Sequence, residues 1–246
     1  MLLDQRQPGE ALWPNKYSAE QLGAIRATIG PTKWAAMYQQ VPRPEGGSEW
    51  PADYFNSGIW FDQWPSVGHR ILALDPSKGR GDKWGDFSAF VKLQYCDGIM
   101  WVDADMANDR NTSIITETGI ELQRTWGSEA FGVESNQFQE VLGTNMLELS
   151  KVRGVPLPLY LIDNRVMKEV RIRRLTPYLG QGSIRFKGGS PGAKLLVQQL
   201  IDFPNGEHDD GPDALEMAVR LLLQVLGQSN DDNRIEQTLQ RVLQRI

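Results

Sequence analysis

Acidic side chains gather in one short segment near the end of the chain. Four carboxylates fall within seven positions: Glu207, Asp209, Asp210 and Asp213. They stand where a loop rich in proline and glycine turns into the apolar run 214–226, which is typical of a buried helix. Since proline is tolerated only in a first turn, Pro212 predicts a helix that begins at Asp209 or Asp210, with Asp213 one turn on. Carboxylates on one helix face can bind a divalent cation, although two of them could simply cap the helix and complement its dipole.

Two further acids stand where predicted strands end. The apolar run 70–75 ends on Asp75, and the run 130–134 ends on Glu134. In an open α/β sheet, ligands gather at the carboxyl ends of parallel strands, so we expect these acids to meet the acidic segment if the two strands are neighbours. Carboxylates brought together repel one another, and a divalent cation removes that cost. Oxygen ligands suit Mg²⁺ or Mn²⁺, and two such ions about 3.5–4 Å apart can stabilise the attacking and leaving oxygens in phosphodiester cleavage.

The amino-acid composition limits which metal ions the chain could bind and where in the cell we expect it. The chain has 246 residues, 40% of them apolar and 23% charged, as in an ordinary globular protein with one large domain and an arm. With one cysteine, Cys96, and two histidines, neither an internal disulfide nor a Cys/His zinc site is expected, so oxygens must hold any metal. No run approaches the roughly 18 apolar residues of a membrane span, and a signal-peptide pattern is lacking. We therefore expect a cytoplasmic protein without a membrane partner.

Basic residues are concentrated in one stretch of a chain whose net charge is -5. Between positions 165 and 187, one acid, Glu169, stands among seven basic residues: Arg165, Lys168, Arg171, Arg173, Arg174, Arg185 and Lys187. Such a strip is suited to follow a nucleic-acid backbone, because phosphate contacts supply affinity that is independent of base sequence. The alternative is a solvated helix face with no partner.

The periodicity of the chain predicts an α/β domain. Strands are predicted over 70–75, 86–93, 99–105, 130–134, 157–163 and 183–187, and helices over 113–126, 140–152, 168–178, 193–203 and from Asp209 or Asp210 to near Gly227. The first three strands have short connections and predict an antiparallel meander. The later alternation of strand and helix predicts that the strands at 70–75, 130–134 and 157–163 are parallel and central. The result is a mixed sheet with helices on both faces.

Three regions are expected along the chain: an N-terminal arm over 1–66, the main domain over 67–228 and a C-terminal amphipathic tail helix over 229–246. In the arm, Ser18 and Gln21 form a capping box for one short helix, and a second is predicted from Thr32 to Gln40. Five aromatic side chains are expected to anchor the arm on the main domain: Trp50, Phe55, Trp60, Phe61 and Trp64. The tail either docks on a partner or folds back.

Several segments resemble the nuclease domain of the large terminase subunit of tailed bacteriophages, which has an RNase H-like fold. The most specific is Phe203–Leu215, which contains the acidic segment. Shorter ones are Ala73–Pro76, Val133–Asn136, Lys168–Ile172, Gly182–Phe186 and Trp34–Pro42. Together they extend over about residues 10–226.

The resemblance implies a two-metal endonuclease that cuts concatemeric double-stranded DNA during genome packaging. It implies Mg²⁺ or Mn²⁺, as two ions, and no nucleotide. The implied catalytic and metal residues are Asp75, Glu134, Asp209, Asp210 and Asp213. Asp86 and His208 are secondary candidates, with a polar strand start and an exposed loop histidine as the alternatives.

The resemblance also implies a biological setting. DNA-backbone contacts fall to Lys168, Arg171, Arg173, Arg174, Arg185 and Lys187. The implied partners are double-stranded DNA, a packaging ATPase, the small terminase subunit and the portal, in the host cytoplasm and not in the mature virion. The chain lacks the G-x-x-x-x-G-K-[ST] loop of an ATPase motor, because Gly188–Leu195 has the wrong spacing. We therefore expect the motor to lie elsewhere.

Other functions fit parts of the same pattern. A Holliday-junction resolvase or an RNase H-type nuclease would use the same fold and acids. A nuclease-inactive docking module of the packaging machine would use the acids only as caps and surface charge. An actin-like ATPase also has a first strand that ends in aspartate, but it needs further glycine-rich phosphate loops that this sequence does not show.

Overall fold

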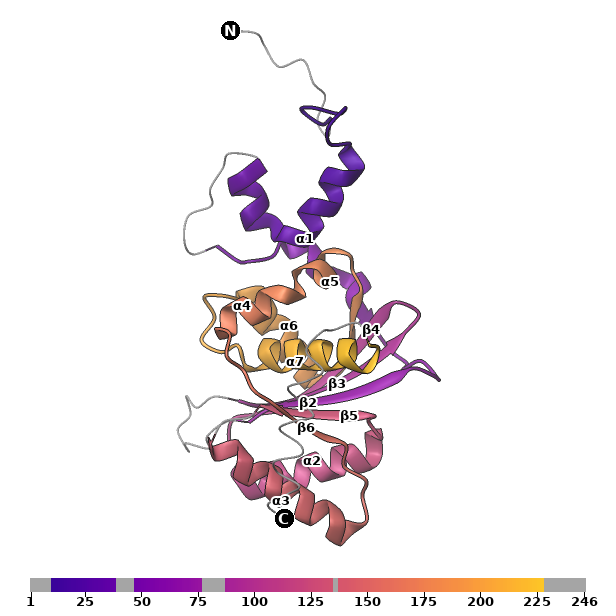
Figure 1. Ribbon diagram of the computed structural model, residues 1–246, viewed down its shortest axis with the longest axis vertical. Helices are drawn as coiled ribbons and strands as arrows, with labels where there is room; N and C mark the ends of the chain where they lie inside the picture. The colour runs from indigo at the N-terminus through magenta and orange to yellow at the C-terminus, as the bar shows by residue number, and fades with distance from the viewer. Residues whose placement is uncertain (1–9, 39–46, 77–86, 135–136, 228–246) are drawn as a thin grey trace.

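A mixed β-sheet runs through the centre of the molecule, with helices on both of its faces (Figure 1). The structure is a computed structural model that describes residues 10–38, 47–76, 87–134 and 137–227. Within these residues the sheet has seven strands in the order β1-β7-β4-β3-β2-β5-β6. Their bounds are β1 Trp60–Phe61, β2 His69–Asp75, β3 Ser88–Cys96, β4 Ile99–Ala107, β5 Ala130–Glu134, β6 Leu159–Ile162 and β7 Ile184–Lys187. The predicted mixed α/β fold is confirmed.

The predicted antiparallel meander is formed by β2, β3 and β4. The turn between β3 and β4 uses Asp97 and Gly98, whose φ angles are 51° and 79°. Two consecutive positive φ angles are what a tight hairpin turn requires, and aspartate followed by glycine adopts them readily. β3 begins at Ser88, and Asp86 lies outside the described residues.

The predicted parallel centre is also present. β2 pairs in parallel with β5, and β5 with β6. In this register Leu74 lies beside Val133, so Asp75 and Glu134, the next residue on each strand, reach the same edge of the sheet. The sheet therefore places two of the predicted acids side by side before any helix is considered.

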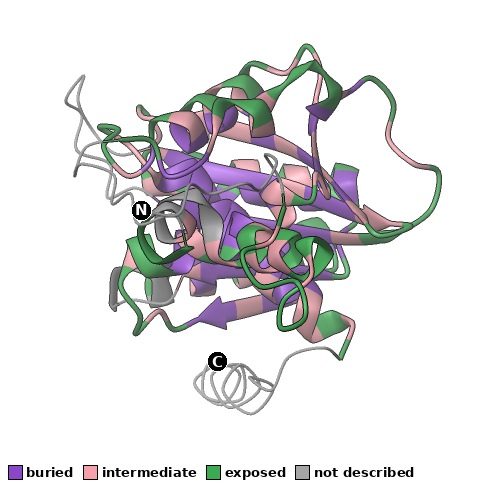
Figure 2. Cartoon of the chain, turned by 90° about the horizontal axis from the view of Figure 1, so that it is seen from above, coloured by how far each residue is buried: buried purple, intermediate pink, exposed green. Residues whose placement is uncertain are grey.

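The helices form two layers. α2 Thr112–Trp126 and α3 Gln137–Arg153 cover one face, while α4 Lys168–Ile172, α5 Thr176–Gly180, α6 Pro191–Asp202 and α7 Asp210–Val225 lie on the other (Figure 1). Two hydrophobic clusters fill the spaces between the sheet and these layers. Figure 2 shows buried residues concentrated on the strands and inner helix faces, with exposed residues around them. The predicted stop of α2 is confirmed, because Gly127 adopts a left-handed conformation with φ 64°.

Two predicted helices differ from the structure. The helix predicted over 168–178 is three pieces: α4, the 3-10 turn η3 Arg173–Leu175, and α5. Pro177 lies in the first turn of α5, where its missing N–H and its ring are tolerated, and it cannot continue the preceding helix. In the arm, the two short helices predicted are one, α1 Ala19–Tyr38, which Figure 1 shows bent into two limbs. Pro31 in its middle supplies the physical reason for a bend without ending the helix.

Described parts of the arm are tied to the main domain. The capping box is confirmed, since the Gln21 amide donates to Ser18 Oγ at 3.1 Å and the Ser18 amide to Gln21 Oε1 at 2.9 Å. After the short turns η1 Ala52–Phe55 and η2 Ser57–Ile59, β1 adds to the sheet in parallel with β7. Trp50 is 1% exposed and stacks on Phe203 with ring centroids 5.3 Å apart.

The domain boundaries at residues 66 and 228 stay predictions, and the tail over 229–246 lies outside the described residues. Among the helices of the described ranges, none has the length and apolar character needed to cross a membrane.

Candidate metal centre

Three carboxylates from three separate elements converge at one edge of the sheet. Asp75 ends β2, Glu134 ends β5 and Asp213 lies in the first turn of α7. One oxygen of each lies within 4.8 Å of the others. Oxygen donors at this spacing are the ligands that Mg²⁺ and Mn²⁺ prefer.

The start of α7 is held at this edge by close packing against α6. The Gly211 amide donates to the buried side chain of Gln199, with Oε1 at 2.9 Å. A Cβ atom at position 211 would lie 2.7 Å from that same oxygen, so a side chain there would displace the Gln199 amide and its hydrogen bond. Because α7 also packs across β2 and β3, its first turn brings Asp213 to the ends of the parallel strands.

Two basic side chains of α4 point into the acids. Lys168 Nζ lies 3.4 Å from Asp75, 2.8 Å from Asp209 and 3.1 Å from Asp210. Asp210 also accepts a hydrogen bond from the Phe87 amide at 2.9 Å. Lys168 therefore links the triad acid Asp75 to the two acids at the N-terminus of α7.

Arg171 makes a two-bond contact with Asp213. Its Nε and Nη2 atoms lie 3.2 and 2.5 Å from the two carboxylate oxygens, and Nη2 is 3.9 Å from Glu134. The site therefore contains two cations, Arg171 and Lys168. It contains five carboxylates, which gives an excess of three negative charges when all are ionised: Asp75, Glu134, Asp209, Asp210 and Asp213.

The surroundings raise the pKa of Asp75, Asp213 and Lys168. Burial raises the pKa of Asp75 well above its usual value; Lys168 partly offsets this, and Asp213, Asp210 and Glu134 add to it. Burial likewise raises the pKa of Asp213 to about 6, against the lowering effect of Arg171. Burial alone lowers the pKa of Lys168, but Asp75, Asp210 and Asp209 outweigh it, so the net shift is upward. Buried negative charge that nearby cations do not balance is what a divalent cation relieves, so these residues fit a metal.

Asn164 joins this site, although the sequence did not point to it. Its Nδ2 donates to Glu134 Oε1 at 2.9 Å, and its Oδ1 accepts from Arg220 at 2.7 Å. Asn164 follows β6, the third parallel strand, so the rule that ligands gather at strand ends would have included it. An asparagine in this position orients the carboxylate without adding charge.

The remaining candidates are not members of the triad. Asp209 and Asp210 contact Lys168, and Asp209 is the more exposed of the two. His208 is half-buried, and its ring lies perpendicular to that of Phe87 at a centroid distance of 5.0 Å. Within the described residues its buried Nδ1 has no hydrogen-bond partner. Asp86 belongs to the segment 77–86, outside the described residues, and its place in the site stays a prediction.

The six residues predicted to contact a DNA backbone do not form one surface. Arg171 is 4% exposed, so it is not available to contact DNA at the surface. Its charge is paired with the buried carboxylate of Asp213. Lys168 is turned into the acids as well. Arg173 pairs with Glu49 at 3.0 Å and Arg174 with Glu216 at 3.1 Å. The other two reach backbone oxygens, Arg185 that of Gly182 and Lys187 that of Asp62.

Fold and site together define a class of protein. A three-stranded meander, extended from its first strand by two parallel strands, is the arrangement of an RNase H-like fold, and the acids at its strand ends could hold a metal ion.

Comparison with known proteins gives structural neighbours only. No family model matches the chain, and no curated protein does. The human cytomegalovirus terminase nuclease domain, soaked with Mn and inhibitor-bound, is 12% identical with a TM-score of 0.49, covering 63% of this chain and 82% of that one. The large terminase nuclease of thermophilic phage G20c with bound magnesium is 16% identical with a TM-score of 0.47, covering 65% and 84%.

A third neighbour is a longer chain. The large terminase of another thermophilic bacteriophage, in complex with ATP-gamma-S, is 10% identical with a TM-score of 0.47. The match covers 67% of this chain and 43% of that one, so this chain corresponds to less than half of that longer terminase. All three similarities concern the fold.

Proposed function

We propose that this chain is a metal-dependent DNA endonuclease, a phosphodiester hydrolase of the terminase type that cleaves concatemeric double-stranded viral DNA during genome packaging. The observation that carries the proposal is the meeting of Asp75, Glu134 and Asp213 within 4.8 Å. Three carboxylates from three elements have no structural need to share one point, and their mutual repulsion is unfavourable without a cation.

Each residue of the site has a proposed task. Asp75, Glu134 and Asp213 hold a divalent cation. Asp209 and Asp210 contact the same lysine as Asp75, and we assign them to a second ion. Bound Mg²⁺ or Mn²⁺ would polarise the scissile phosphate and lower the pKa of a bound water. Arg171 fixes the orientation of Asp213, and Asn164 that of Glu134. Residues that orient metal ligands in this way commonly affect affinity or activity by about 10–100-fold.

The biological setting is proposed from the resemblance of the acidic segment and the strand-end motifs. The substrate would be duplex DNA, and the partners a packaging ATPase, the small terminase subunit and the portal. The site of action would be the host cytoplasm, with no copy expected in the mature virion.

The proposal is tested with supercoiled plasmid in Mg²⁺, Mn²⁺ or EDTA. We expect nicking and degradation in either metal and none in EDTA. Asp75→Asn should abolish cleavage, because it removes one of the three converging carboxylates. Glu148→Gln, an exposed acid on α3, is the matched control and should cleave like the wild type.

Two further arms separate the alternatives. Four-way junctions and RNA–DNA hybrids distinguish a resolvase or RNase H-type enzyme, because preference for either over duplex DNA would move the assignment there. Intact plasmid in Mn²⁺ would favour the nuclease-inactive docking module.

A further inference from the structure

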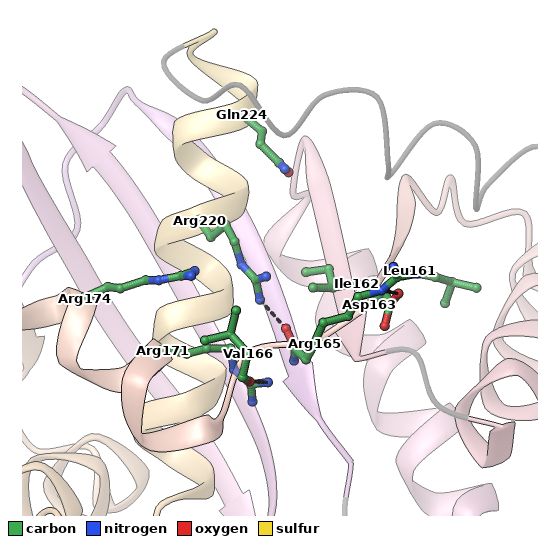
Figure 3. Close-up of a pocket in the computed structure, with 10 residues that line it drawn as sticks. Leu161, Ile162, Asp163, Arg165, Val166, Arg171, Arg174, Arg220 and Gln224 are labelled. Atoms are coloured by element: carbon green, nitrogen blue, oxygen red, sulfur yellow. Dashed lines mark hydrogen bonds and ion pairs between the residues drawn. The ribbon is translucent and has the colours of Figure 1, made fainter.

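A pocket lined by arginine side chains lies beside α7 and next to the candidate metal centre. It has a volume of about 200 Å³ and lies between α7, α4 and the segment that follows β6. Four arginines line it: Arg165, Arg171, Arg174 and Arg220. Figure 3 shows Arg220 reaching from α7 toward the segment after β6, with Arg171 and Arg174 approaching from the opposite side.

Each arginine around this pocket has an acidic partner, and two of them share one. Asp163 pairs with Arg165 at 2.8 Å, and Asp213 takes the charge of Arg171. Glu216 is shared, because it lies 3.1 Å from Arg174 and 3.3 Å from Arg220. Glu134 also lies 3.9 Å from Arg171 Nη2, so four guanidinium groups face four carboxylates.

One buried donor group of the pocket, Arg220 Nε, has no hydrogen-bond partner among the described residues. Burial lowers the pKa of Arg220, with Glu216 acting against that effect. Buried N–H groups are normally satisfied, and a guanidinium offers five donors arranged to meet the oxygens of a phosphate.

The pocket shares two residues with the metal centre. Asn164 lines it and donates to Glu134, while Arg171 lines it and binds Asp213. A group bound in the pocket is thus one side chain away from two of the three converging acids.

We propose that this pocket binds a backbone phosphate of the nucleic-acid strand that occupies the metal centre, with Arg174 and Arg220 as its donors. The inference rests on the proposed nuclease function for the identity of the strand. It gives the enzyme a contact that fixes the strand beside the cleaved bond. Leu161 and Val166 supply apolar wall, which suits the sugar attached to such a phosphate.

The test measures binding without cleavage, by fluorescence anisotropy of a labelled duplex oligonucleotide in Ca²⁺ and in EDTA over a range of salt concentrations. Arg174→Gln should weaken binding about tenfold at low salt, the effect of one charged hydrogen bond. It should also reduce the slope of log affinity against log salt by about 0.9, the value for one duplex phosphate. Arg124→Gln, on α2 across the sheet, removes an exposed arginine and should change neither quantity.

A second variant guards against loss of fold. Gln224 lines the pocket with an uncharged side chain, so Gln224→Glu adds a repelling charge and leaves the Glu216 pairs intact. It should weaken DNA binding while the melting temperature stays that of the wild type. If both variants bind DNA like Arg124→Gln, or if the wild type fails to bind DNA at low salt, the pocket does not hold a strand phosphate.

Competitors identify the ligand class. A short oligonucleotide should displace the labelled duplex from the wild type far better than inorganic phosphate at equal ionic strength. An acidic peptide that competes equally well would overturn the phosphate assignment. The outcome is separate from that of the nuclease proposal. If the wild type cleaves plasmid but both variants bind DNA as tightly as it does, only the pocket proposal is refuted. If both variants bind DNA more weakly than the wild type but the wild type does not cleave plasmid, only the pocket proposal is supported.

Discussion

Arg171 and Asp213 form a buried ion pair at the centre of the site, joined by two contacts of 3.2 and 2.5 Å, with side chains 5% and 1% exposed. The pair joins α4 to the first turn of α7. It also sets the position of one of the three acids that converge at the sheet edge. One arginine therefore contributes both to the packing of α4 on α7 and to the position of an acid in the triad.

Arg171→Met should destabilise the protein by about 3–5 kcal/mol, because it leaves the buried Asp213 carboxylate without a partner. Urea denaturation in EDTA measures this. Arg153→Met is the control: its pair with Glu117 is exposed, and its loss should cost about 1 kcal/mol or less. If both variants lose the same free energy of unfolding, the buried pair contributes no more to stability than the exposed one.

Lys168→Gln should tighten Mn²⁺ binding, because the ammonium group at 2.8–3.4 Å from Asp75, Asp209 and Asp210 competes with a cation for the same carboxylates. Titration calorimetry should give a lower dissociation constant than for the wild type. Lys194→Gln, an exposed lysine on α6, should leave the constant unchanged. Weaker Mn²⁺ binding by Lys168→Gln would show that the lysine helps to build the site instead of competing for it.

Magnesium should raise the melting temperature of the wild type, since a cation that binds only the folded state adds about 2.7 kcal/mol at a hundred times its dissociation constant. Asp75→Asn should lose this shift. In EDTA the same variant should melt above the wild type, because burial disfavours the charged Asp75 carboxylate and the amide is neutral. Thermal melts with and without metal check both statements, and a full magnesium shift in Asp75→Asn would remove Asp75 from the proposed ligands.

Trp50→Ala should cost about 3–5 kcal/mol, the usual effect of removing a buried large aromatic side chain. Trp50 stacks on Phe203, and its Nε1 donates to Thr176 Oγ1 at 2.9 Å. Trp13→Ala is the control, because Trp13 is 62% exposed. Urea denaturation of both variants measures the difference. Similar stabilities would show that Trp50 does not anchor the arm on the main domain.

Much of the fold follows from local pattern. The apolar runs that end on Asp75 and Glu134 form parallel neighbours, as predicted. A parallel strand that is buried on both faces reads as a continuous apolar run, so both strands could be recognised in the sequence. Pro212 correctly indicated the start of α7, since proline fits only a first turn. These features depend on a few consecutive residues, which the sequence displays directly.

Contacts between distant segments had to come from the tertiary structure. The basic strip predicted as one surface is divided, because α4 turns Lys168 and Arg171 inward to acids 42 residues away. Asn164 carries no pattern that marks it, and it gains a role only where β6 ends beside Glu134. Adjacent aspartates are chemically identical in the sequence, so only the direction of α7 distinguishes Asp213, which meets Asp75 and Glu134, from Asp209 and Asp210, which meet Lys168. The sequence alone determined which elements form and which residue types could bind a metal, because both depend on local chemistry; which of those side chains meet depended on long-range packing.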